Sequence, residues 1–309
     1  MSKLLVVFGA TGQQGGSVAS HVATDPILGK EYRIRAITRD PSKPAAQALA
    51  KKGMEVEYAD SDDIESLQHA FQGAHTVFGA TFTVYDDQMK EREIRQGKAI
   101  ADAALQCGVQ HLIYSTLPHA GKNSDGKHTV GHFDSKAEVE SYIRGLPIRS
   151  TFFAPGCFMQ NFHNILAPRA AEDGTYCINN IMAPQTRLPL IDIAEDAGKF
   201  VGGILDDPEG LEGKALCSAI GLYSMEDIAQ VMSHVTGKTV TYKQIPVETS
   251  QGLLPPAAAN HIVHMFLYFQ DAGYYGSETA ELVSWAAKRA RGKLTTLEEF
   301  LNKCPLKLQ

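Results

Sequence analysis

The sequence predicts an α/β protein with a doubly wound parallel sheet and a smaller C-terminal α/β lobe. The apolar run KLLVVFGA at residues 3–10 ends in glycine, which is typical of a central parallel strand covered on both faces. Strands and amphipathic helices then alternate with some regularity until about Ala154, as in a doubly wound sheet. After Ala154 the rhythm changes to short segments rich in Pro, Gly and Asn. We therefore expect two unequal parts, residues 1–154 and an interleaved smaller lobe at residues 155–309.

Six strands and five helices are expected in the first part, joined by right-handed crossovers. The strands are expected at residues 3–10, 32–38, 54–60, 75–82, 109–117 and 147–155. The helices between them are expected at residues 14–24, 43–52, 63–72, 88–107 and 132–144.

The smaller lobe shows three amphipathic helices and a strand. Their expected positions are 191–205, 224–237 and 255–276 for the helices, and 238–247 for the strand. Ser224 is a suitable N-cap for the second of these helices, and Gly237 stands just past its last turn.

Composition narrows the class of protein. The chain has 309 residues, of which 44% are hydrophobic and 21% charged, which is ordinary for a globular protein. Its net charge of −6 disfavours nucleic acid or an anionic membrane as the main partner. Five scattered cysteines without a C-x-x-C pair fit a reducing compartment. No cleavable leader and no run of about 18 apolar residues is evident, so we expect a cytoplasmic protein.

A glycine motif follows the first strand. Gly9, Gly12 and Gly15 are spaced G-x-x-G-x-x-G where the strand turns into a helix. In a dinucleotide-binding turn, the first glycine permits the tight bend, the second lets the pyrophosphate approach, and the third lets the helix close on the strand. The alternative is a tight turn that binds nothing. Its position in the first βα turn of a parallel sheet favours the dinucleotide.

Charges after the second strand bear on the choice between NAD and NADP. An acid at this position pairs with the ribose 2′-hydroxyl, whereas arginine accommodates a 2′-phosphate. Arg39 comes first, Asp40 follows, and Lys43 lies about one helical turn beyond. Two cations around one carboxylate favour NADP(H); the alternative is an ordinary charged loop in which Asp40 contacts the ribose.

Two further strand ends are candidates for the same ligand. After the third strand, Asp60 and Ser61 are placed to hydrogen-bond the edge of an adenine; alternatively, Ser61 or Asp62 caps the next helix. The end of the fourth strand is expected to pass under the cofactor, near Thr81, Phe82 and Thr83.

The segment HFDSKAEVESYIR places a lysine beside the apolar face of an expected helix. Burying a charge without a partner is costly, so either that face of the helix is exposed to water or Lys136 meets a group that needs it. The pattern is similar to that of short-chain dehydrogenases, in which a helix carries Y-x-x-x-K beside the nicotinamide. In those proteins a Ser or Thr of the fifth strand orients the substrate carbonyl. Here the pair is His132 and Lys136, and the strand ends in Ser115-Thr116. The tyrosine acid is missing.

Taken together, the chain resembles the NmrA-like family of atypical short-chain dehydrogenase relatives over essentially its whole length. The segments that carry the resemblance are VVFGATGQQGGSVA, TRDPSK, DSDD, HFDSKAEVE, PGCFMQNF and HMFLYFQDAGYYG. The resemblance implies a Rossmann-type fold that binds NADP(H), with a loop after the sixth strand flanking the nicotinamide. The candidate cofactor residues are Gly9, Ala10, Thr11, Gly12, Gln13, Gln14, Gly15, Arg39, Lys43, Asp60, Ser61, Thr81, Phe82, Thr83, Lys136, Phe158, Met159, Gln160 and Asn161.

The family resemblance leaves two functions open. One is a redox sensor that responds to NADPH or NADP and passes the signal to a regulatory protein partner. The other is an NADPH-dependent oxidoreductase that reduces a small aromatic or conjugated substrate. His132 and Lys136 are the candidate catalytic residues, although His132 is alternatively a capping residue and Lys136 a ribose ligand.

Aromatic residues could line an apolar substrate pocket, although aromatic stripes at helical spacing more often belong to a core. The candidates are Phe152, Phe153, Phe158, Phe162, Phe266, Tyr268, Phe269, Tyr274 and Tyr275. His261 and His264 lack an acidic partner, so no metal site is expected.

Overall fold

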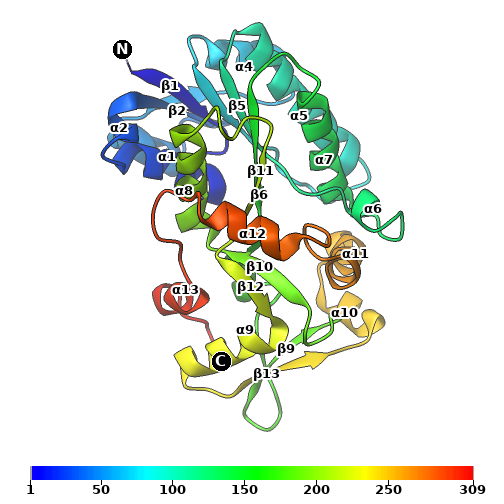
Figure 1. Ribbon diagram of the computed structural model, residues 1–309. Coiled ribbons are helices and arrows are strands. Elements are labelled where there is room, and N and C mark those ends of the chain that lie inside the picture. The colour runs from blue at the N-terminus through cyan, green and yellow to red at the C-terminus, as the bar shows by residue number, and fades with distance from the viewer. Residues whose placement is uncertain (1, 309) are drawn as a thin grey trace.

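A seven-stranded sheet, parallel throughout, forms the larger part of the protein (Figure 1). The computed structural model describes residues 2–308, and the strand order is β11-β6-β5-β4-β1-β2-β3. The predicted doubly wound parallel sheet is confirmed. Its first six strands are β1 (Lys3–Val7), β2 (Tyr32–Thr38), β3 (Glu55–Tyr58), β4 (Thr76–Gly79), β5 (His111–Ser115) and β6 (Ser150–Pro155).

The seventh strand was not predicted from the sequence. β11 (Ala215–Ser218) pairs in parallel with β6, from Ala215 beside Phe152 to Ser218 beside Pro155. The chain therefore returns to the main sheet after residues 157–191 have built part of the smaller lobe. The predicted boundary between residues 154 and 155 stays a prediction.

Helices cover both faces of this sheet (Figure 1). Strand side chains alternate, so Leu5 and Val7 pack with α1 and α8, whereas Leu4 and Val6 pack with α4, α5 and α7. The helices of this part are α1 (Gln13–Thr24), α2 (Leu28–Glu31), α3 (Pro44–Lys51), α4 (Ile64–Phe71), α5 (Met89–Gln106), α6 (Ala120–Asn123), α7 (Gly131–Ile143) and α8 (Ile193–Asp206).

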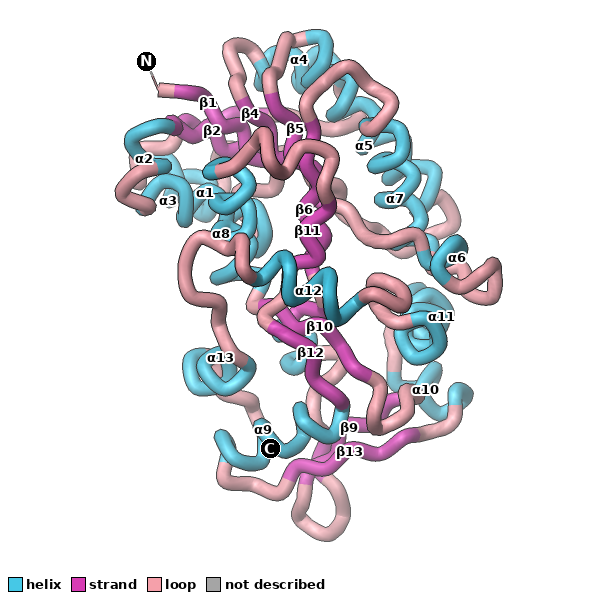
Figure 2. The backbone as a smooth tube through the Cα atoms, in the orientation of Figure 1, coloured by secondary structure: helices cyan, strands magenta, loops and turns pink. Residues whose placement is uncertain are grey.

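The smaller lobe is built on two three-stranded sheets (Figure 2). One has the order β12-β10-β7 and the other β13-β9-β8. The strands are β7 (Cys157–Phe158), β8 (Arg169–Ala170), β9 (Tyr176–Asn180), β10 (Arg187–Ile191), β12 (Gly221–Ser224) and β13 (Val240–Gln244). The helices are the 3₁₀ turn η1 (Met159–His163), α9 (Met225–Thr236), α10 (Val247–Leu253), α11 (Pro256–Ala272), α12 (Thr279–Ala287) and α13 (Leu297–Lys303).

Two helices show how capping residues and glycines determine where a helix begins and ends. α9 has the expected Ser224 cap, which forms a reciprocal capping box with Asp227, and ends at Gly237 with φ +66°. α11 ends at Ala272, four residues before the predicted end. Gly273, with φ +79°, turns the chain there and sends Tyr274 and Tyr275 back toward β6.

The predicted extent of the fourth strand is wrong. β4 ends at Gly79, opposite Tyr114 of β5, and its other neighbour β1 ends at Val7, opposite Phe78. Residues 80–88 form a loop that leads into α5, and Thr81, Phe82 and Thr83 lie on it. Among the described residues, no helix is long and apolar enough to cross a bilayer; the cytoplasmic location stays a prediction.

Candidate functional site

The first βα turn requires its glycines for different reasons. Gly9 has φ +61°, and its carbonyl accepts a 2.8 Å hydrogen bond from the Gly12 amide. A Cβ on Gly15 would lie 2.2 Å from the Phe8 carbonyl oxygen, so the helix can close on the strand only with glycine there. A Cβ on Gly12 would meet only the Gly9 oxygen, at 3.3 Å. No side chain caps α1, which leaves its N-terminal amides available to an anion.

A polar cavity of about 310 Å³ lies over this turn. It is formed where β1, β2, β3 and β4 end, at the carboxyl edge of the sheet where such folds bind ligands. The predicted cofactor residues that line it are Gly9, Thr11, Gly12, Arg39, Lys43, Asp60, Ser61, Thr81 and Phe82. Of the other residues of the turn, Ala10 and Gly15 are buried and Gln13 is exposed outside both cavities of the site.

Two exposed cations, Arg39 and Lys43, line the polar cavity. Neither belongs to an ion pair among residues 2–308. The Asp40 carboxylate instead accepts hydrogen bonds from the Ser42 amide at 3.0 Å and the Ser42 hydroxyl at 2.5 Å. These bonds lower the pKa of Asp40. The Asp40 carboxylate therefore makes its hydrogen bonds within its own loop, and the two cations remain free to contact a ligand.

The acidic segment after β3 contributes both to the polar cavity and to the start of α4. Asp60 and Ser61 line the polar cavity. Asp63 caps α4 by accepting hydrogen bonds from the amides of Glu65 and Ser66. The alternative that Ser61 or Asp62 caps this helix is therefore wrong, because the helix begins one residue later than an Asp62 cap requires and two later than a Ser61 cap requires.

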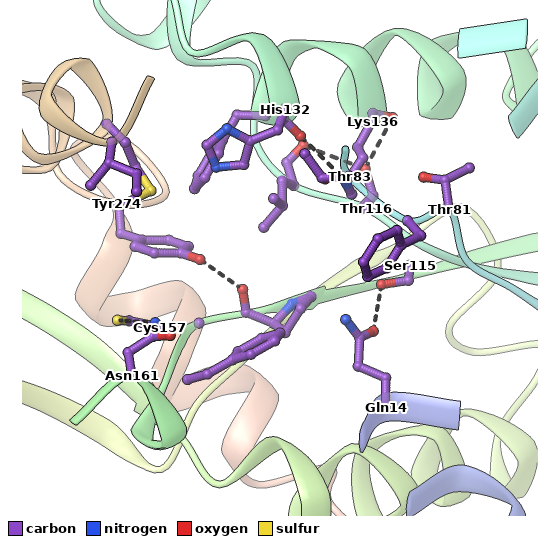
Figure 3. A pocket seen from close by; sticks show the side chains of 18 of the residues that line it. Gln14, Thr81, Thr83, Ser115, Thr116, His132, Lys136, Cys157, Asn161 and Tyr274 are labelled. Atoms are coloured by element: carbon purple, nitrogen blue, oxygen red, sulfur yellow. Dashed lines mark hydrogen bonds between the residues drawn. The ribbon is translucent and has the colours of Figure 1, made fainter. Parts of the chain in front are cut away.

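A second cavity, the apolar cavity, continues from the first and measures about 330 Å³ (Figure 3). Thr81 and Phe82 line both cavities. Gln14 and Ser115 line the apolar cavity, and the Ser115 hydroxyl donates to the Gln14 side chain at 2.8 Å. The remaining lining residues are Thr83, Tyr85, Thr116, Leu117, His132, Phe133, Lys136, Pro155, Gly156, Cys157, Phe158, Asn161, Ile165, Ile262, Met265, Phe269 and Tyr274.

Lys136 meets a buried carboxylate that sequence reasoning missed. Its ammonium group donates to Glu93 Oε1 at 2.7 Å, to Thr83 Oγ1 at 3.0 Å and to the His132 carbonyl at 3.2 Å. These three bonds use all three of its donors. Glu93 comes from α5 and is 1% exposed. The protein itself thus neutralises the inward lysine.

A sequence signal for Glu93 did exist. Met89, Glu93, Gly97 and Ile100 are spaced by four, four and three residues, and all are buried on one face of α5. An acid within such a stripe needs a buried partner. Ser135, next to Lys136 on α7, supplies a second one by donating to Glu93 Oε2 at 2.5 Å.

His132 is an uncharged residue of the apolar cavity. α7 begins at Gly131 after the N-cap Val130, so the alternative of His132 as a capping residue is wrong. Burial lowers its pKa to about 3, and nearby Lys136 and His261 act in the same direction. Nδ1 is buried without a hydrogen-bond partner. The imidazole is therefore neutral at pH 7 and cannot act there as an imidazolium acid.

Two tyrosines border the same cavity. The Tyr274 hydroxyl donates to the Pro155 carbonyl at 3.1 Å, and burial raises its pKa well above the usual value (Figure 3). Tyr85, which sequence reasoning missed, packs its ring 5.6 Å from that of His132. Burial also raises the pKa of Tyr85, and Glu93 adds to the shift. Both phenols thus hold their protons firmly.

The loop after β6 divides between cavity and core. Phe158 and Asn161 line the apolar cavity. Met159 is buried in the hydrophobic core of the smaller lobe, and the Gln160 side chain donates to Asp192 at 2.7 Å. Burial raises the pKa of Cys157 to about 11, so this lining thiol is protonated at neutral pH.

Of the nine aromatic residues considered for a pocket, three line the cavity: Phe158, Phe269 and Tyr274. The other six pack in the hydrophobic cores, as the alternative interpretation of aromatic stripes predicts: Phe152, Phe153, Phe162, Phe266, Tyr268 and Tyr275.

The sheet, the glycine turn and the two adjoining cavities define a Rossmann-type dinucleotide-binding fold. A family model described as the NmrA-like family matches residues 1–301, and the chain belongs to that family. An NmrA-like family domain-containing protein of Dictyostelium discoideum is 31% identical, with both chains covered completely.

Two solved structures share the fold. NmrA, a negative transcriptional regulator in complex with NADP, matches with a TM-score of 0.81 and 24% identity, over 98% of this chain and 95% of that one. Citrobacter sp. triphenylmethane reductase complexed with NADP(H) matches with a TM-score of 0.77 and 26% identity, over 97% and 99%. The same fold therefore occurs in a protein described as a transcriptional regulator and in one described as a reductase.

Proposed function

We propose that this chain binds NADP(H), with the adenosine half in the polar cavity and the nicotinamide half entering the apolar cavity. The glycine turn and the uncapped start of α1 suit a pyrophosphate. Arg39 and Lys43, which form no ion pair among the described residues, suit a 2′-phosphate. Both solved relatives named above were determined with this class of cofactor.

We further infer that the protein acts as a regulator that responds to the NADPH/NADP state and passes it to a protein partner. The observation that carries this inference is the state of the titratable side chains in the apolar cavity, where Lys136 is paired with Glu93 and His132 is neutral. Reduction of a carbonyl by hydride needs a proton donor of suitable pKa within reach. His132, Tyr85 and Tyr274 are all poorly suited to that task at pH 7.

The second candidate function is an NADPH-dependent oxidoreductase. It is favoured by the size of the apolar cavity, about 330 Å³, beside the expected position of the nicotinamide. Such a volume accommodates a small aromatic substrate. The suitable acceptors are conjugated molecules that take hydride at carbon and a proton from water.

Calorimetric titration with NADPH, NADP, NADH and NAD tests the cofactor. We expect wild type to prefer the phosphorylated cofactors, and Arg39→Ala to lose at least about tenfold in NADPH affinity with NADH affinity unchanged. Arg33→Ala is the matched control, because Arg33 is an exposed arginine of β2 that pairs with Glu55. An Arg39→Ala protein that binds NADPH like wild type would contradict the 2′-phosphate assignment.

NADPH oxidation in the presence of quinones, enones and imines separates the two roles. Selective binding with no oxidation supports the regulator. Sustained oxidation that depends on one compound supports the oxidoreductase instead.

A further inference from the structure

We propose that Glu93 is a positioning residue of the cofactor site, which holds the Lys136 ammonium group where the nicotinamide ribose of NADP(H) meets it. This inference rests on the proposed NADP(H) binding and names a residue through which that binding is organised. Lys136 lines the apolar cavity, whereas Glu93 lies behind it and lines neither cavity. Glu93 can therefore affect a ligand there only through the groups it holds.

Glu93 joins three separate segments of the chain. It lies on α5, it accepts hydrogen bonds from Ser135 and Lys136 of α7, and it accepts from Thr81 at 3.3 Å and Thr83 at 2.9 Å on the loop 80–88. One carboxylate thus fixes the lysine and the loop relative to each other. Such preorganisation lowers the entropy that a ligand must overcome on binding.

Stability alone is a weak reason for this ion pair. The Glu93 side chain is 1% exposed and that of Lys136 is 11% exposed. Desolvating two charges costs about as much as their attraction returns, and apolar residues of similar volume often serve as well. A pair placed at a cavity wall, with its cation toward the cavity, is better explained by a ligand that the cation contacts.

One N–H group of Lys136 can change its hydrogen-bond acceptor without leaving a buried group unpaired. The Thr83 hydroxyl accepts from Lys136 at 3.0 Å and also donates to Glu93 at 2.9 Å. If a ribose hydroxyl replaces Thr83 as the acceptor, Thr83 keeps its bond to Glu93. Meanwhile Glu93 and the His132 carbonyl continue to hold the nitrogen in place.

Two ligands distinguish this role from general damage to the protein. NADPH carries both halves of the cofactor, whereas adenosine 2′,5′-bisphosphate carries the 2′-phosphate and lacks the nicotinamide ribose. We expect Glu93→Gln to lose about tenfold in NADPH affinity and to bind the bisphosphate within about twofold of wild type. Glu91→Gln is the matched control, because Glu91 is an exposed acid two residues away on α5. It should bind both ligands like wild type.

A double-mutant cycle tests whether Glu93 acts through Lys136. In a Lys136→Met background, Glu93→Gln should cause no further loss of NADPH affinity, because the group it positions is gone. The double variant also buries no unpaired charge. If Glu93→Gln alone does not fold, Glu93→Asp, which keeps the charge but shortens the side chain that holds Lys136, should show the same selective loss of NADPH relative to the bisphosphate.

The possible failures are distinguishable. NADPH binding by Glu93→Gln as tight as wild type, or equal losses for both ligands, overturns the role of Glu93 and leaves NADP(H) binding intact. A wild-type protein that binds neither ligand overturns the proposed cofactor, and the role of Glu93 with it.

Discussion

The polar and apolar cavities adjoin at one edge of the same sheet, yet their charged side chains differ in exposure and in pairing. In the polar cavity, Arg39 and Lys43 are exposed and unpaired among the described residues. In the apolar cavity, Lys136 is buried against Glu93, and His132 is neutral. The first arrangement suits recognition of phosphate by charge. The second suits recognition of an uncharged ring by shape, with charge confined to one fixed ammonium group.

The largest expected effect separates two glycines of the first βα turn. Gly15→Ala should lower the free energy of unfolding by about 3 kcal/mol, because its Cβ would lie 2.2 Å from a backbone carbonyl that cannot move aside cheaply. Gly12→Ala should change it by no more than about 1 kcal/mol, but should weaken NADPH binding at least about tenfold by occupying the approach to the turn. Urea denaturation and calorimetry measure the two effects.

Gly53→Ala is a useful reference for this pair. Gly53 has φ +85° with nothing within 4 Å of an added Cβ, so Gly53→Ala should lower the free energy of unfolding through backbone strain alone. A Gly12→Ala protein that keeps wild-type NADPH affinity would show that the pyrophosphate does not approach this turn.

Local sequence patterns were sufficient to predict most residues of the polar cavity and many of the apolar cavity, but not the contacts that organise the apolar cavity. β2 occupies residues 32–38 as predicted, and loops after parallel strands must meet at one edge. Glu93 and Lys136 are 43 residues apart on different helices, and a single sequence does not reveal that they meet. β11 is four residues long and is recognisable only through its pairing with β6. Met159 and Gln160 were grouped with Phe158 by position, but the 3₁₀ turn directs their side chains elsewhere.

The second effect tests whether His132, in the apolar cavity, is neutral in the folded protein. The pKa of His132 is about 3 in the folded protein against 6.5 as its ordinary value, so the unfolded chain binds a proton that the folded one excludes. Stability is therefore lost as pH falls below 6.5. Between pH 7 and pH 5, wild type should lose about 2 kcal/mol more than His132→Phe, as measured by urea denaturation.

Buried His111, whose pKa is about 4, titrates in both proteins and cancels in this difference. His264→Gln, which changes an exposed histidine of α11, should keep the wild-type pH dependence. Identical pH dependence of His132→Phe and wild type would mean that His132 carries its proton in the folded protein.

The smallest effect concerns Phe82, which borders both cavities. Its side chain is 72% exposed, so Phe82→Ala should change the free energy of unfolding by less than about 0.5 kcal/mol. If its ring covers the bound cofactor, NADPH affinity should fall by about threefold in calorimetry, through the loss of buried apolar area. Val84→Ala, at an exposed residue of the same loop, is the control and should have no effect on binding. Unchanged NADPH affinity in Phe82→Ala would place the cofactor away from this loop.

The pairing of β11 with β6 has a consequence for the order in which the chain folds. β6 ends at Pro155 and its partner begins at Ala215, so this edge of the sheet stays open while about sixty residues emerge from the ribosome. During that interval, Phe152 and Phe153 lie on a strand with unpaired backbone groups, which is the kind of edge that associates with other chains. A protein shortened before residue 215 keeps that edge permanently. Completing the sheet thus waits until residues 157–191 of the smaller lobe and helix α8 have been made.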